Sequence, residues 1–71
     1  MNDVRDLLAK LHGARERINP NQHYDHDGLT MRGEQLLEVT DAAITLLKAL
    51  GDDAIAMPRL KQLLEVLEDL P

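Results

Sequence analysis

The stretch 30–51, TMRGEQLLEVTDAAITLLKALG, decides the fold expected of this chain. Placed on a helix at about 100° per residue, it separates an uncharged side from a charged and polar side. The uncharged side fills roughly half of the circumference, whereas an ordinary surface helix has an apolar stripe a little over about 100° wide. Its members are Leu36, Leu37, Val39, Thr40, Ala43, Ile44, Leu46, Leu47 and Leu50. We therefore predict the central helix of a small bundle, in contact with two neighbours.

Two further helices are predicted to flank this segment. Residues 3–18 repeat apolar side chains at helical spacing, and Pro20 stops the helix because it disfavours helical geometry at the residue before it. Residues 54–70 are rich in leucine on one side, and Pro58 suits a first helical turn. Fourteen leucines, no Phe or Trp and a single tyrosine also favour helix over strand. The expected fold is all-α, a small three-helix bundle with a long loop between its first two helices.

The ends of the central helix, expected at 30–50, are marked by particular residues. Thr30 is a suitable N-cap and Gly51 a suitable residue to end the helix. Gly33 lies on the apolar side, where a missing side chain would allow the loop or the first helix to approach closely. At 71 residues the chain is long enough for one domain, which we place at 1–71.

The connection 19–29, NPNQHYDHDGL, is expected to be an irregular surface loop. It is longer than the usual helix–helix connection of about 2–8 residues, and long loops are often functional. It holds Tyr24 between His23 and His26, and tyrosine is favoured at the energetic centres of protein interfaces. We expect Tyr24 to anchor a partner, and Tyr24→Ala to leave the fold intact while weakening binding.

The same loop has some of the side chains of a metal site. His23, Asp25, His26 and Asp27 offer imidazole and carboxylate ligands of the kind that divalent ions accept. However, their spacing matches no established pattern, His12 is the remaining histidine, and the chain has no cysteine. A solvated loop without a ligand would contain the same kinds of polar residues, so no metal and no cofactor are predicted.

Composition narrows the classes of function. Thirteen acidic against eight basic side chains give a net charge of −5, which repels nucleic-acid phosphates and anionic lipids. No apolar run reaches the roughly 18 residues of a membrane span. No serine, cysteine or nucleophile motif is present, and short leucine-rich helices offer little concavity for catalysis. We therefore expect a non-enzymatic, cytoplasmic protein with no direct contact to nucleic acid or membrane.

Charged side chains supply the remaining candidates for partner binding. Glu34, Glu38 and Asp41 lie close together on the charged side of the central helix, where they would steer a basic partner. Arg15 and Arg17 lie on the first helix and support Tyr24. For Arg15 two interpretations stay open: its stem covers the edge of the core, or its guanidinium is presented to a partner's carboxylate.

Three functions remain open on these residues. The first is a small acidic module that binds and modulates another protein. The second is an acidic inhibitor that occupies the nucleic-acid-binding surface of a host machine, as small acidic proteins, many of them phage-encoded, do; that likeness is one of composition only. The third is a self-assembling structural bundle. The wide apolar sides of the two later helices also favour association, either with a second copy or with a partner helix.

Overall fold

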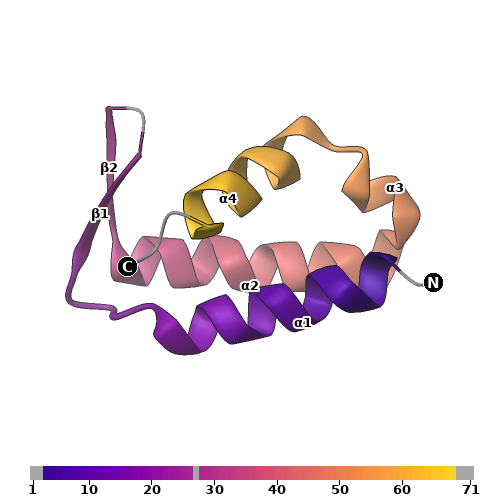
Figure 1. Ribbon diagram of the computed structural model, residues 1–71, viewed down its shortest axis with the longest axis horizontal. Helices are drawn as coiled ribbons and strands as arrows, with labels where there is room; N and C mark the ends of the chain where they lie inside the picture. The colour runs from indigo at the N-terminus through magenta and orange to yellow at the C-terminus, as the bar shows by residue number, and fades with distance from the viewer. Residues whose placement is uncertain (1–2, 27, 69–71) are drawn as a thin grey trace.

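The computed structural model describes residues 3–26 and 28–68 (Figure 1). These residues form four helices and one two-stranded antiparallel sheet. In chain order the elements are α1 (Asp3–Arg17), β1 (His23–His26), β2 (Leu29–Arg32), α2 (Gly33–Leu50), α3 (Asp52–Ile55) and α4 (Pro58–Glu68). Helices α1 and α2 lie antiparallel and side by side, the hairpin stands at one end of this pair, and α4 returns across it from the other end (Figure 1).

Helix α2 is the central element, as the sequence predicts. Its buried side chains recur at helical spacing and pack against α1, α3 and α4; they are Leu36, Thr40, Ala43, Ile44 and Leu47. Thr40 is fully buried, and its hydroxyl donates a 2.7 Å hydrogen bond to the Leu36 carbonyl, so its polar atom costs little in the core. Gly51 ends the helix with a φ of 59°, and its N–H donates to the Leu47 carbonyl at 2.9 Å.

The expected irregular loop contains a β-hairpin instead. Strands β1 and β2 pair in the register Tyr24 with Met31 and Asp25 with Thr30. The Thr30 hydroxyl donates a 2.7 Å hydrogen bond across the strands to Asp25 Oδ1. Gly28 adopts a φ of 81° at the connection, a conformation that glycine reaches without steric cost. The fold is therefore mostly helical, as expected, with a small two-stranded sheet that the expectation of an all-α chain did not include.

The hairpin also moves the start of the central helix. Thr30 is a suitable cap by sequence, but residues 29–32 are paired with β1, and α2 begins at Gly33. The first turn is closed by Gln35, whose Oε1 accepts a hydrogen bond from the Arg32 N–H at 3.2 Å. Thr30 contributes its hydroxyl to the sheet and not to the helix, because the strand pairing extends past it.

The predicted third helix, 54–70, is divided into α3 and α4. Pro58 begins α4, and the residue before a proline is disfavoured in helical geometry, so the helix breaks at residues 56–57. The Met57 N–H donates to the Ala54 carbonyl at 3.0 Å in a tight turn. Residues 69–71, where this helix is expected to end, lie outside the described residues. The break turns α4 back over α2 (Figure 1).

Gly33 is the point where the loop and α2 meet most closely. A Cβ at this position would overlap the Asn19 carbonyl oxygen and would lie 2.8 Å from the Pro20 Cα. The Gly33 N–H donates to the Gln22 carbonyl at 2.8 Å. The predicted close approach at Gly33 is confirmed, and it fixes the hairpin against the two long helices.

Candidate functional site

Tyr24, the predicted anchor, belongs to the core. Its side chain is 9% exposed, and its hydroxyl accepts a 2.9 Å hydrogen bond from the Asn19 N–H. A buried aromatic ring with a paired hydroxyl contributes directly to stability. The expectation that Tyr24→Ala leaves the fold intact is therefore corrected, because that change removes a core side chain.

The two histidines beside Tyr24 occupy different positions in β1. His23 is exposed and lies opposite Arg32 in the sheet register, so it points away from the face that carries Tyr24. His26 pairs with Leu29, and its side chain lies outside the described part of the structure, as does Asp27. Within the described residues, no group of three His, Asp or Glu side chains is placed to hold a metal ion.

Two of the predicted partner-binding residues bind each other. Arg15 on α1 donates from Nε to Asp41 Oδ1 on α2, and its Nη2 lies 3.5 Å from Oδ2. Both side chains remain 50% exposed. The carboxylate that Arg15 meets thus belongs to its own chain, and the pair links α1 to α2 at the surface.

The acidic group of α2 is partly neutralised. Asp41 is paired with Arg15, and Glu34 Oε2 lies 3.9 Å from Arg32 Nη2 in an exposed ion pair. Among the residues described, Glu38 forms no ion pair and is exposed. The structure therefore keeps one carboxylate of this group without a cationic partner among the described residues.

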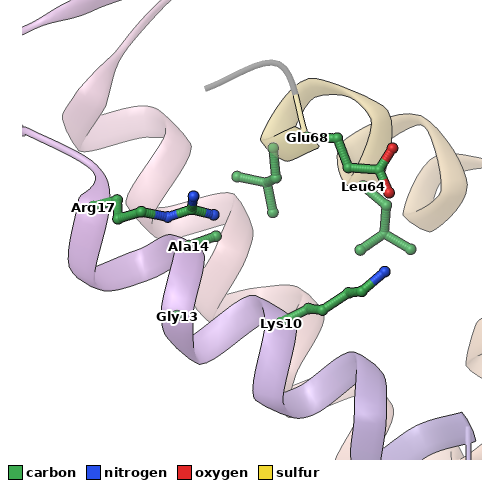
Figure 2. Close-up of a pocket in the computed structure, with 7 residues that line it drawn as sticks. Lys10, Gly13, Ala14, Arg17, Leu64 and Glu68 are labelled. Atoms are coloured by element: carbon green, nitrogen blue, oxygen red, sulfur yellow. The ribbon is translucent and has the colours of Figure 1, made fainter. Parts of the chain in front are cut away.

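A cleft lies between α1 and α4, and Arg17 is one of the residues that line it. Its volume is about 290 Å³, and small residues on α1 leave the room for it. In Figure 2 the Lys10 and Arg17 side chains extend from α1 on either side of Ala14, and the Glu68 carboxylate lies beside Leu64 on α4. The lining residues are Lys10, Gly13, Ala14, Arg17, Leu64, Leu67 and Glu68. Charges of both signs thus border this α1/α4 cleft.

A second depression lies on the other flank of α4, and we call it the α2/α4 groove. It consists of two hollows of about 380 and 220 Å³ that share Val39, Arg59 and Leu63. The first is completed by hairpin, α2 and α4 residues: Tyr24, Met31, Leu36, Gln62 and Val66. The second is completed by Ala42, Ala43, Leu46, Met57 and Leu60. The groove is therefore continuous between α2 and α4 and almost entirely apolar.

Large apolar side chains are left uncovered in this groove. Val39 is 41% exposed and Met57 is 37% exposed, although both border a buried core. From Leu36 to Leu46 the α2 wall extends over eleven residues, or about 15 Å at the rise of an α-helix. Arg59, which belongs to both hollows, is its one charged member among the residues described.

The sequence does not predict the groove itself, but it does predict the excess of apolar surface that forms it. The apolar sides of the two later helices are wider than a thin bundle covers, which predicts that part of them faces a partner. The sequence does not single out Val39 and Met57 as the exposed members, because their exposure depends on where α4 lies relative to α2. Val39, Met57 and Arg59 are not among the candidate residues of the sequence analysis.

No family model, no curated protein and no solved structure matches this chain. Within residues 3–26 and 28–68, no helix has the length and apolar character needed to cross a bilayer.

Proposed function

We propose that this protein is a non-enzymatic interaction module that binds and modulates another protein through the α2/α4 groove. The observation that carries the proposal is the continuous apolar groove with Val39 and Met57 exposed in it. Contiguous apolar surface on a small charged protein is typical of an interaction site. Burial of this surface would contribute roughly 25 cal/mol for each Å² removed from water.

The chemistry of the groove supports binding over catalysis. Its polar groups are the Arg59 guanidinium, the Gln62 amide and the Tyr24 hydroxyl, and that hydroxyl already accepts a hydrogen bond. General acid–base or nucleophilic catalysis needs a titrating or nucleophilic group placed in a pocket that excludes water. The groove is open along its length and supplies no such pair among its described lining residues.

The proposal also includes the arrangement of the helices. We take α1, α2 and α4 as a three-helix bundle in which α3 is a turn and the hairpin supports the groove at one end. We place the protein in the cytoplasm.

Two variants of α2 with the same change of charge test the proposal. Val39→Asp puts a carboxylate into the groove, whereas Thr45→Asp puts one on the exposed side of the same helix. Wild-type and variant proteins are used to capture binding proteins from the native host, which are quantified by mass spectrometry. We expect at least one protein to be retained by wild type and Thr45→Asp and lost by Val39→Asp.

Circular dichroism and thermal melting of both variants are the control for folding. Because Val39 is already 41% exposed, its replacement is expected to lower the free energy of unfolding by about 1 kcal/mol or less. Retention of the same set of proteins by both variants contradicts the role of the groove.

The acidic-inhibitor function is the second candidate, and Glu38 is the observation that favours it. Its carboxylate has no cationic partner among the described residues, and the chain carries a net charge of −5. In that case, Glu34→Lys with Glu38→Lys abolishes binding and affinity falls steeply with added salt. Binding that is insensitive to salt but lost in Val39→Asp assigns the contact to the groove.

Self-assembly is tested by the oligomeric state. Sedimentation of the wild-type protein at two concentrations distinguishes a monomer from a dimer. A concentration-dependent melting temperature is the second sign of association. A dimer that is lost in Val39→Asp but kept in Thr45→Asp would place the second copy in the groove.

A further inference from the structure

Among the described residues that line the α2/α4 groove, the one charged side chain is positive, whereas the net charge of the protein is negative. The Arg59 side chain lines both hollows, is exposed, and forms no hydrogen bond or ion pair within residues 3–26 and 28–68. We propose that the occupant of the groove is an amphipathic helix of a partner protein, with a carboxylate that meets Arg59. This inference rests on the proposed function and specifies the kind of partner.

The walls of the groove favour a helix over an extended segment. They are formed mostly by side chains of α2 and α4, whose backbone groups in the middle of each helix are bonded within that helix. An extended segment would bury its own N–H and C=O groups against apolar side chains without partners, which is costly. A helix satisfies those groups internally. The length of about 15 Å accommodates about three turns.

The pattern of the groove also matches the spacing of a helical ligand. Its α2 wall presents Leu36, Val39, Ala43 and Leu46, which recur every three to four residues along one side of the helix. A helix that packs beside this row presents apolar side chains at the same intervals. The occupant is therefore expected to be apolar on one side over about three turns.

The requirement for a carboxylate follows from the position of Arg59. At long range, the net charge of −5 attracts basic partners. Arg59 is exposed in the free protein, but an apolar occupant that covers the groove would remove water from its guanidinium, and an unpaired charge in such surroundings is unfavourable. Arginine forms forked hydrogen bonds with carboxylates, so an Asp or Glu on the occupant relieves this cost. The local and the overall charge thus predict opposite preferences.

Two labelled synthetic peptides measure this preference. Both are capped helices of about four turns, with leucines spaced three and four residues apart. They differ only in one central residue beside the leucines, which is Glu in one and Lys in the other. Dissociation constants are measured by fluorescence anisotropy at about 0.15 M salt, where charges are screened beyond about 8 Å. We expect wild type to bind the Glu peptide about fivefold more tightly.

Charge reversal at two positions of α4 identifies the responsible residue. Arg59→Glu is expected to reverse the preference, so that the Lys peptide binds more tightly. Lys61→Glu makes the same change of charge on the same helix but outside the groove lining, and it is expected to keep the preference for Glu. Melting curves confirm that both variants are folded.

Several results overturn the inference. They are binding of neither peptide, equal binding, tighter binding of the Lys peptide by wild type, and a Glu preference that survives Arg59→Glu. A dimer that Val39→Asp dissociates also overturns it, because a second copy then fills the groove. In contrast, the proposed function fails when Val39→Asp retains every partner of the wild-type protein, so the two failures are distinguished.

Discussion

Two regions of the molecule differ in how closely they are packed. One is the end where the hairpin meets α2, and the other is the surface around α4. At the hairpin end, Gly33 touches the backbone of Asn19, and Tyr24 is buried with its hydroxyl paired. Around α4, by contrast, a cleft or groove opens on each flank, and a Cβ added to Gly13 would meet no atom within 4 Å. The comparison indicates that the closed end around Gly33 holds the fold, whereas the flanks of α4 leave apolar surface uncovered.

Gly33→Ala is expected to have the largest effect on stability. The added methyl group overlaps the Asn19 carbonyl and approaches the Pro20 Cα, and backbone atoms cannot move aside as a flexible side chain does. We expect a loss of about 3 kcal/mol or more in the free energy of unfolding, measured by urea denaturation. Such a loss is a large part of the stability of a small domain.

Gly13→Ala is the matched control on the open side. Nothing obstructs a Cβ there, and alanine favours a helix interior over glycine, so we expect a gain of up to about 1 kcal/mol. Equal losses in both variants would contradict the difference in packing between the two regions.

Tyr24→Phe is expected to have an intermediate effect. The ring stays in the core, but the Asn19 N–H loses the oxygen to which it donates at 2.9 Å. Removal of one partner of a partly buried hydrogen bond costs about 1–2 kcal/mol. Thermal and urea unfolding should both show the loss. A stability equal to that of wild type would mean that this hydrogen bond contributes nothing to the closed end.

The Arg15–Asp41 pair is expected to have the smallest effect. Both side chains are 50% exposed, so solvent screens their attraction, and exposed pairs are worth about 0.2–1 kcal/mol. A double-mutant cycle with Arg15→Ala and Asp41→Ala measures the coupling. The coupling should decrease with added salt. A coupling well above 1 kcal/mol would contradict the expectation that solvent screens this exposed pair.

The central helix is predictable because its periodicity extends over five turns. Its buried row runs from Leu36 to Leu47, and Gly33 and Gly51 are recognisable by position. The hairpin is harder to predict, because each strand has four residues and its outward positions are polar. The Asp27-Gly28 dipeptide is the available signal, since Asp-Gly is favoured in two-residue hairpin connections.

The candidate site is less predictable than the fold. Tyr24 stands out in the sequence as the only aromatic residue, but the alternation of the hairpin turns its ring inward. Arg15 and Asp41 lie 26 positions apart, so their pairing depends on the antiparallel packing of α1 and α2. The groove depends on the break at residues 56–57, which sets the path of α4, and local sequence does not determine that path.

Methyl-group NMR of the protein bound to its partner tests the role of the groove most directly. Chemical shifts are compared for the free protein and for the complex with a protein that wild type and Thr45→Asp retain and Val39→Asp loses. We expect the largest changes at the methyl groups of Val39, Met57 and Leu63 in the groove. We expect little change at Leu7 and Leu8 on α1. Large changes at Leu7 and Leu8, with the groove methyl groups unmoved, would contradict binding at the α2/α4 groove.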